Sequence, residues 1–428
     1  MIPAYRVQAD LYEIPKFNIQ KRNIEEFVEE LKGFHEEFRD CFLRQEPRER
    51  FFQYMVGQLS QLEDESIEPI ALNVEGGKVR AMQFFISNAF WNEKRMVRKY
   101  RALANEDMGD PEGVLIFDET GFVKKGNDSA GVARQYCGSL GKVENCQVGV
   151  FAGYASHHGY CLQGARLFIP QRWFSDEYKK KRQKCDFPSD LQFKTKPQLA
   201  VELFQEIRDQ GVIPFRYVVA DTLYGNSPDF IETLEKVAEV TYFVAMPHST
   251  LCWLDKPMTV KKEYRHKGSK RTRNILVGTE KAPLSFSKIA QNTNNYFWYR
   301  RIVSEGAKGP IEYEFTRRRV TLSRKGLPTK EVWLIIKRNR DTGRYFYYIS
   351  NASRDSRLKT FVWLSGIRWA IEQCFEETKS ELGMDHYEVR KYPSWNRHIL
   401  ISMLSHFFLW HIKIRLGEKS THYYSVAA

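Results

Sequence analysis

The chain has 428 residues, of which 42% are hydrophobic, 14% aromatic and 28% charged. This length corresponds to roughly two to four domains. The composition is globular, which excludes a largely disordered, collagen-like or fibrous chain. The formal net charge of +13 at pH 7 favours an anionic partner.

Neither a membrane span nor a targeting segment is expected. The longest apolar stretch, His398–Ile412, contains three His and two Ser, and it is shorter than the roughly 20 residues that cross a bilayer. The N-terminal residues are mixed and partly acidic, unlike a signal or transit peptide. The seven Cys lie far apart without zinc spacing, so we expect neither disulfides nor structural zinc. We therefore expect an intracellular, cytoplasmic protein.

The first 105 residues have a helical pattern. Apolar residues at helical spacing between Ile24 and Phe42 predict a first helix, with Asn23 as its N-cap. Pro47 suits the first turn of a second helix that extends to Leu62. A third helical region is expected over 78–103. It contains a cationic cluster that either contacts DNA or forms an ordinary solvated face: Lys94, Arg95, Arg98 and Lys99.

The spacing of the apolar residues changes after Gly113, from a helical to a strand-like period. Alternating or continuous apolar runs predict three strands in succession, then helix, strand, helix, strand. The expected strands lie near 113–117, 144–156, 159–170, 215–220 and 240–247, and the expected helices at 196–211 and 228–237. This order indicates an α/β fold with a mixed sheet covered by helices. After residue 350, one long helix is expected over 364–383 and a last helix over 395–416.

Residues 250–350 are strand-like, and they carry the whole positive excess. Between Lys256 and Tyr345 there are 23 basic and 7 acidic residues, whereas the rest of the chain has a net charge of −3. Basic residues alternate with aromatics there, as expected for a polyanion ligand. A solvated basic surface is the alternative, and a membrane surface fits less well. The candidate DNA contacts in this segment are Trp298, Arg300, Arg301, Arg317, Arg318 and Arg319.

Two acids follow apolar strands. Asp118 in VLIFDETG and Asp221 in VVADTLYGN are each expected where a strand leaves the sheet. A carboxylate there is costly unless it is paired, hydrogen-bonded or bound to a metal, and strand ends are where α/β folds place ligands. The alternative for each is a helix-cap or turn Asp.

A third acid lies in the helix after the basic segment. Glu372 follows Arg368 by four residues and precedes Lys379 by seven, so the three share one helix face. Surface ion pairing is the alternative. Oxygen ligands without a His/Cys cluster suit Mg²⁺ or Mn²⁺. Three carboxylates can hold two such ions for phosphoryl transfer, with Arg368 and Lys379 contacting phosphates.

On these residues the chain resembles the DDE transposases of bacterial insertion sequences, specifically the insertion sequence 701 group of the insertion sequence 4 superfamily. Asp118, Asp221 and Glu372 match the acids in order, 103 and 151 residues apart. The resemblance implies an RNase H-like core and a homodimer that synapses two DNA ends. It also implies an aromatic residue that holds a flipped base, for which Trp298 is our candidate. Ser365 occupies the position of the signature Tyr.

We therefore predict a transposase that cleaves transposon ends and transfers strands into target DNA. It would bind two Mg²⁺ or Mn²⁺ ions through Asp118, Asp221 and Glu372, and it would act at the bacterial nucleoid. Its double-stranded DNA partners would be the terminal inverted repeats and the target. The alternatives are a domesticated DNA-binding protein and a nuclease that does not join strands. The expected domains are a helical DNA-binding region (1–108), the first part of the core (109–249), an all-β basic insertion (250–352), and core helices with a tail (353–428).

Overall fold

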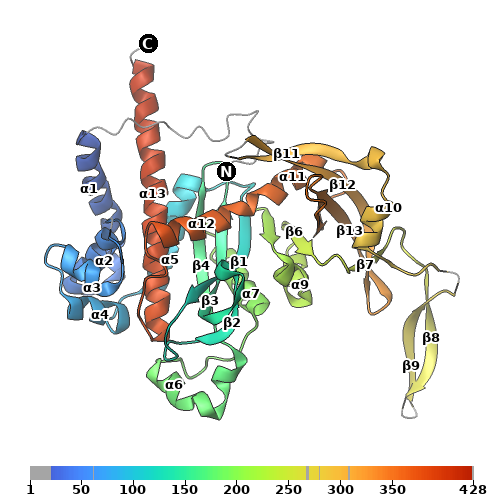
Figure 1. Cartoon of the computed structure of the whole chain (residues 1–428), viewed down its shortest axis with the longest axis horizontal. Coiled ribbons are helices and arrows are strands. Elements are labelled where there is room, and N and C mark those ends of the chain that lie inside the picture. The colour runs from blue at the N-terminus through green and yellow to red at the C-terminus, as the bar shows by residue number, and fades with distance from the viewer. Residues whose placement is uncertain (1–20, 61, 267–268, 279, 307–308, 427–428) are drawn as a thin grey trace. The chain divides into compact units, whose positions relative to one another are not determined.

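The computed structural model describes residues 21–426 except 61, 267–268, 279 and 307–308 (Figure 1). The described chain divides into two compact units. We call residues 217–368 the central unit, and residues 21–216 together with 369–426 the flanking unit. The helical prediction for residues 1–20 falls outside the described residues.

The flanking unit begins with helices. They are α1 (Lys21–Glu36), η2 (Arg39–Cys41), α2 (Gln45–Gln58), α3 (Ile67–Asn73), α4 (Val79–Ser87) and α5 (Glu93–Met108). The apolar stripe expected in the first helix is confirmed only in part. Leu31 and Phe34 are buried, but Val28 is 43% exposed, and the helix ends at Glu36 and not near Phe42. Pro47 lies in the first turn of α2. The N-cap prediction for Asn23 is wrong, since the chain is already helical at Lys21.

The third helical region, expected over 78–103, consists of two helices, α4 and α5. Residues 88–92 between them are not helical. Trp91 is buried in this segment and stacks on Phe85 with ring centroids 5.8 Å apart. The side chain of Asn92 accepts a hydrogen bond from the backbone N–H of Arg95 at 2.9 Å and caps α5. The buried indole and the new cap account for the break.

Strands and further helices follow in the flanking unit. They are β1 (Val114–Val123), β2 (Ala133–Cys137), η3 (Gly138–Leu140), β3 (Lys142–Ala155), β4 (Tyr160–Phe168), η4 (Gln171–Phe174), η5 (Asp176–Tyr178), α6 (Lys179–Lys184) and α7 (Lys196–Gln210). The three predicted strands are confirmed as β1, β3 and β4, and β3 pairs antiparallel with both of the others. Asp118, however, lies inside β1 and not at its end. The reason is the register, because β3 pairs with β1 along all of β1, from Val114 to Val123.

Helix α7 has the start and stop that its sequence predicts. Thr195 and Gln198 form a capping box, which satisfies two backbone N–H groups at the N-terminus. Gly211 ends the helix in the left-handed region, with φ +59°, a conformation that costs glycine little.

The central unit contains a mixed sheet. Its elements are β5 (Tyr217–Ala220), α8 (Thr222–Gly225), α9 (Pro228–Glu235), β6 (Thr241–Met246), β7 (Leu251–Trp253), β8 (Thr259–His266), β9 (Ser269–Leu276), β10 (Leu284–Ser285), α10 (Phe286–Asn292), η6 (Asn295–Phe297), β11 (Tyr299–Gly306), β12 (Gly309–Arg324), β13 (Leu327–Arg338), β14 (Tyr345–Ser350) and α11 (Leu358–Ile367). Strands β5 and β6 are parallel, and the sheet continues antiparallel through β14, β13, β12 and β7 to β10. The α/β class and the mixed sheet expected for an RNase H-like core are therefore confirmed.

The basic insertion is mostly but not entirely β. It contains the helix α10, whose Phe286 and Ile289 are buried. The side chain of Ser285 caps α10 by accepting the N–H of Lys288 at 3.3 Å. The all-β prediction is wrong at this point, because a capped helix of seven residues carries too little periodicity to stand out in a strand-rich segment.

The flanking unit ends with α12 (Trp369–Ser380) and α13 (Tyr392–Val426). The helix expected over 364–383 is thus divided into α11 and α12, which meet at Arg368. In the flanking unit, α13 packs against α2, α4, α5 and β4 (Figure 1). Within the described part of the chain, we find no helix with the length and apolar character needed to cross a membrane.

Candidate active site

Asp118 projects from β1 toward helix α12. Side chains alternate along a strand, so Asp118, Thr120 and Phe122 share one face of β1. Lys379 of α12 lies against that face, with its ammonium 5.0 Å from the centroid of the Phe122 ring. Asp118 is partly exposed. Its Oδ1 accepts a hydrogen bond from the backbone N–H of Glu119 at 2.8 Å.

Helix α12 runs along β1 and β3 in the same direction as β1. At its start, Ile371 packs so closely on Gly153 that a Cβ there would lie 3.2 Å from the Ile371 side chain. Farther along, the ring of Phe375 is 5.1 Å from that of Phe151, the cross-strand partner of Asp118. The middle of α12 is therefore level with Asp118.

Lys379 joins the last turn of α12 to β1. Its Nζ donates hydrogen bonds to Thr120 Oγ1 and to the carbonyl oxygen of Gly121, both at 2.8 Å. Burial lowers the pKa of Lys379, and the Asp385 carboxylate opposes part of that shift. The sequence did not single out Thr120 as a partner of Lys379. Its position two residues after Asp118, on the same strand face, was the available signal.

Glu372 lies on the first turn of α12 and is exposed. It precedes Phe375 by three residues and Lys379 by seven, so all three lie along one side of the helix. The flanking unit thus carries Asp118 and Glu372 on a strand and a helix that pack against each other.

Asp221 belongs to the central unit and stands where β5 ends, as the sequence predicted. It is also the N-cap of α8, because its Oδ1 accepts the N–H of Leu223 at 2.8 Å and that of Tyr224 at 3.4 Å. The turn needs glycine at position 225, since a Cβ there would lie 2.1 Å from the carbonyl oxygen of Ala245. This packing sets the direction in which the chain leaves β5.

The donor atoms of these three side chains are carboxylate oxygens, which suit Mg²⁺ or Mn²⁺. Asp118 and Asp221 are partly exposed and Glu372 is exposed, so a hydrated ion can reach each carboxylate. Within either unit by itself, the described residues include no group of three or more His, Cys, Asp or Glu side chains placed to hold a metal ion.

The comparison with known families decides the class of the protein. A family model described as DDE superfamily endonuclease matches residues 37–310, more than half of the chain. The chain is a DDE superfamily endonuclease. The matched residues include Asp118 and Asp221, whereas Glu372 lies beyond them. Endonucleases of this family act on DNA and depend on divalent metal ions.

Two individual proteins are similar to this endonuclease. One is described as a probable transposase for insertion sequence element IS701 from Microchaete diplosiphon, and it is 24% identical over 350 residues, which cover 80% of this chain and 77% of the relative. The other is a cryo-EM structure of the piggyBac transposase synaptic complex with hairpin DNA. It matches with a TM-score of 0.42 and 9% identity, covering 90% of this chain and 72% of that chain. The family assignment rests on the match over residues 37–310.

Arg368 stands at the junction of α11 and α12. Its backbone is helical, with φ −55° and ψ −30°. Ser365, three residues earlier, donates its hydroxyl to the carbonyl oxygen of Val362 at 2.7 Å. Its short side chain is therefore bonded to its own helix.

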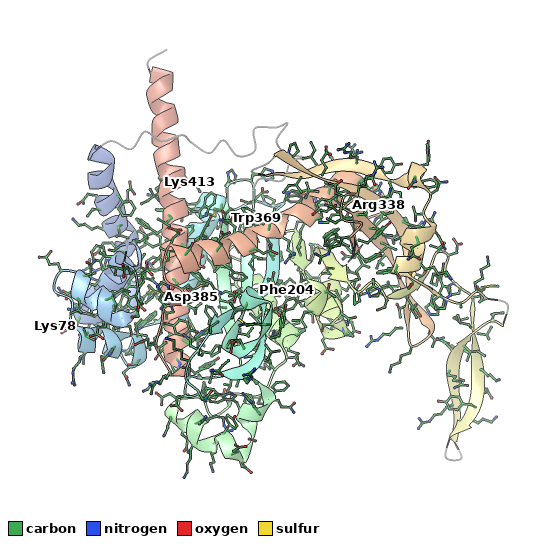
Figure 2. All side chains as sticks on the ribbon, viewed as in Figure 1. Lys78, Phe204, Arg338, Trp369, Asp385 and Lys413 are labelled. Carbon is green, nitrogen blue, oxygen red and sulfur yellow. The ribbon has the colours of Figure 1, made fainter. Side chains whose placement is uncertain are left out.

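Trp298 is largely covered in the central unit. It is 8% exposed, and the guanidinium of Arg338, labelled in Figure 2, lies 4.1 Å from its ring centroid. Among its neighbours on β11, Arg300 forms an ion pair with Glu312. Arg301 is exposed and donates to the carbonyl oxygen of Arg300 at 2.7 Å.

The three consecutive arginines of β12 point to two faces of the sheet. Arg317 and Arg319 lie over the ring of Trp333, with guanidinium carbons 4.6 and 5.4 Å from its centroid. Arg319 also pairs with Glu331 at 2.9 Å, and Arg317 donates to the carbonyl oxygen of Ser356. Arg318 is exposed. Two of the three therefore have structural partners in the central unit.

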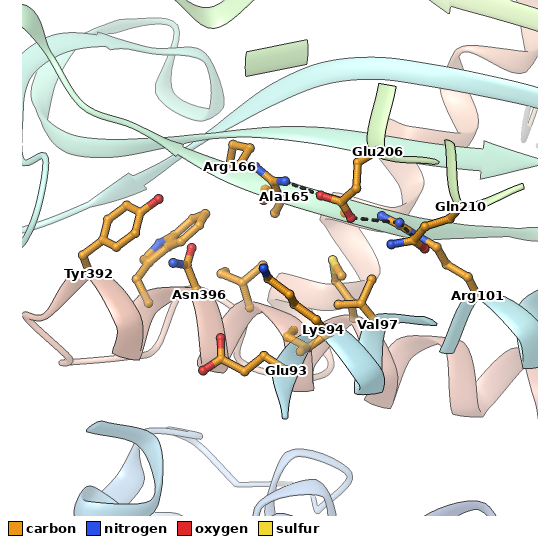
Figure 3. A pocket seen from close by; sticks show the side chains of 15 residues that line it. Glu93, Lys94, Val97, Arg101, Ala165, Arg166, Glu206, Gln210, Tyr392 and Asn396 are labelled. Carbon is orange, nitrogen blue, oxygen red and sulfur yellow. Dashed lines mark hydrogen bonds and ion pairs between the residues drawn. The ribbon is translucent and has the colours of Figure 1, made fainter. Parts of the chain in front are cut away.

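Of the four candidate cations of α5, two form ion pairs within the flanking unit and the other two are exposed. Arg95 and Lys99 both pair with Asp40, as expected for a helix packed on its neighbour. Arg98 is exposed. Lys94 is exposed as well and lines a cavity of about 560 Å³ formed by α5, β4, α7 and α13 (Figure 3).

A buried ion network closes one side of this cavity. Arg101 of α5 is 1% exposed and pairs with Glu206 of α7 at 2.8 Å. Glu206 also pairs with Arg166 of β4 (Figure 3). Burial alone would raise the pKa of Glu206, but Arg166 and Arg101 hold it below its usual value. This network ties the predicted DNA-contacting helix α5 to β4 and α7.

Proposed function

We propose that this endonuclease is a transposase of a bacterial insertion sequence, which cleaves the ends of its element and transfers them into target DNA. The observation that carries the proposal is the packing of α12 along β1, which presents Glu372 from the helix that Lys379 anchors beside Asp118. Asp221, at the end of β5, supplies the second acid in the order of the family.

In this proposal, Asp118, Asp221 and Glu372 hold two Mg²⁺ or Mn²⁺ ions. Such ions, when bound, activate the attacking oxygen and stabilise the leaving oxygen of an in-line displacement. Arg368 and Lys379 bind phosphate oxygens of the DNA strand beside the carboxylates. Water attacks first and frees a 3′-hydroxyl at the element's end, and that hydroxyl then attacks a phosphodiester of the target.

The DNA partners in this proposal are terminal inverted repeats and target DNA, synapsed by a homodimer at the bacterial nucleoid. Trp298 holds a flipped base, for which Arg338 must leave its ring. Arg300, Arg301, Arg317, Arg318 and Arg319, with Lys94, Arg95, Arg98 and Lys99, supply further DNA contacts. Six members of this set are exposed: Arg300, Arg301, Arg318, Lys94, Arg95 and Arg98. Of these, Arg300 and Arg95 must first leave their partners Glu312 and Asp40.

Strand cleavage and joining of DNA that carries the element's flanking ends test the proposal, with Mg²⁺, Mn²⁺ or EDTA. Metal-dependent 3′-hydroxyl ends that become joined to target DNA are expected, and Asp118→Asn and Glu372→Gln should each abolish them. Glu376→Gln is the matched control, because Glu376 is exposed one turn farther along α12 and its substitution removes the same charge.

The products separate the alternatives. Salt-sensitive binding without strand breakage would favour a domesticated DNA-binding protein. Nicks that are never joined would favour a nuclease. Undiminished cleavage by both Asp118→Asn and Glu372→Gln would refute the assignment of the acids.

A further inference from the structure

Strands β8 and β9 form a two-stranded antiparallel ribbon that pairs with no other strand among the described residues (Figure 1). Its described side chains are exposed on both faces, apart from Ile275 and Leu276 at its base, which are half-buried. Tyr264 is 39% exposed and Val260 is 48% exposed. An isolated two-stranded ribbon is only marginally stable in water. This ribbon has no core of its own and gains stability when a partner covers it.

The ribbon is strongly basic, with seven Lys or Arg and one Glu between Thr259 and Leu276. The register sorts the described cations by face, because directly paired residues share a face. Lys262 pairs with Arg273, and Tyr264 pairs with Arg271. One face thus presents three cations around Tyr264 and, in its described part, no acid. We call it the arginine face.

The opposite face differs in charge. Lys261 lies there with Glu263, and Lys270 lies there too, since its partner in the ladder is residue 265. This face carries an acid between its cations. Substitutions on this face provide a control for substitutions on the arginine face, because both faces belong to the same two strands.

The cations of the arginine face differ from other arginines of the central unit in their charged partners. Arg319, Arg300 and Arg338 elsewhere in the central unit each pair with a glutamate. For Lys262, Arg271 and Arg273, by contrast, no ion pair with any described carboxylate is found. The guanidinium carbon of Arg273 lies 5.5 Å from the centroid of the Tyr264 ring on the same face.

We propose that the β8–β9 ribbon binds in the major groove of duplex DNA through its arginine face. Two strands lie about 4.8 Å apart, and the major groove, about 12 Å wide, admits a ribbon of this size. Arg271 and Arg273 are two residues apart, which is about 6.8 Å along an antiparallel strand and equals two base-pair rises of about 3.4 Å. Each guanidinium can donate two hydrogen bonds to the O6 and N7 of a guanine.

This inference rests on the proposed function, and its test separates the two. Affinity for duplexes with the element's end sequence, and for scrambled duplexes, is measured by fluorescence anisotropy in EDTA over a range of salt. Arg271→Gln with Arg273→Gln should weaken binding to the end-sequence duplex about tenfold or more and reduce the preference for it over the scrambled duplex. Lys261→Gln with Lys270→Gln removes the same charge and should weaken it much less.

Dimethyl sulfate footprinting locates the contact, because it methylates guanine N7 in the major groove. Protection by the wild type that disappears in the arginine variant is expected. Equal weakening by both double variants, no weakening by either, or protection confined to minor-groove adenines would each overturn the ribbon proposal. If the wild type cleaves and joins ends while the arginine variant binds normally, only the ribbon proposal fails. A wild type that neither binds duplex nor cuts it refutes the proposed function itself.

Discussion

The buried ion network beside the cavity should be the most sensitive electrostatic contact of the flanking unit. Replacement of Glu206 by Gln removes a negative charge and keeps the side-chain shape. Arg101, which is 1% exposed, would then keep only neutral partners. They are the carbonyl oxygen of Gln163, at 2.8 and 3.2 Å, and Gln210 Oε1, at 2.7 Å.

The expected cost follows from this geometry. Loss of one partner of a fully buried ion pair costs about 3 to 5 kcal/mol. The Glu206 side chain is 30% exposed, and water can replace part of its interaction with Arg101. We therefore expect Glu206→Gln to lower the free energy of unfolding by about 2 kcal/mol, which corresponds to a decrease in Tm of about 5 °C for a unit of this size.

Urea and thermal unfolding, followed by circular dichroism, measure this loss. Glu202→Gln is the control, because Glu202 lies on the same helix and pairs with Lys194 at the surface, where both side chains are more than one third exposed. Such a pair contributes at most about 1 kcal/mol. If Glu206→Gln costs no more than Glu202→Gln, the buried network does not stabilise the unit and the reasoning is refuted.

Two further predictions concern Lys379 and His398. Lys379→Met should lower the free energy of unfolding by about 2 kcal/mol, because Thr120 Oγ1 and the Gly121 carbonyl lose a charged donor. The same variant should slow DNA cleavage at least about tenfold, because the proposed contact of Lys379 with phosphate is lost. Unchanged cleavage by a folded variant would leave Lys379 only a structural role. Burial lowers the pKa of His398 from 6.5 to about 4, so the unfolded chain binds a proton first as the pH falls. The free energy of unfolding should therefore decrease by up to about 3 kcal/mol as the pH falls from 6.5 to 4. Urea unfolding of His398→Asn across this range should show a smaller decrease. Equal decreases in the wild type and the variant would contradict the prediction.

The sequence by itself determined the elements whose signals are local. The capping box at Thr195 and Gly211 define α7 without any tertiary contact. Strands β1, β3, β4, β5 and β6 and helices α7 and α9 follow in the order that the hydrophobic period predicts, whereas β2, α6 and α8 were not predicted. Asp221 follows its strand as expected. The order and spacing of the three acids also indicated the DDE superfamily, because that pattern is a property of the chain alone.

Only the tertiary structure decided how far these elements extend and which charges are already engaged. Strand β1 continues past Asp118 because β3 pairs with it to Val123, and no local signal in β1 encodes that partner. Arg319 is engaged by Glu331, twelve residues away on the next strand, whereas Arg271 and Arg273 look the same in sequence and are exposed on the β8–β9 ribbon. The physical reason is that pairing and burial depend on residues distant in sequence, which composition and periodicity do not report.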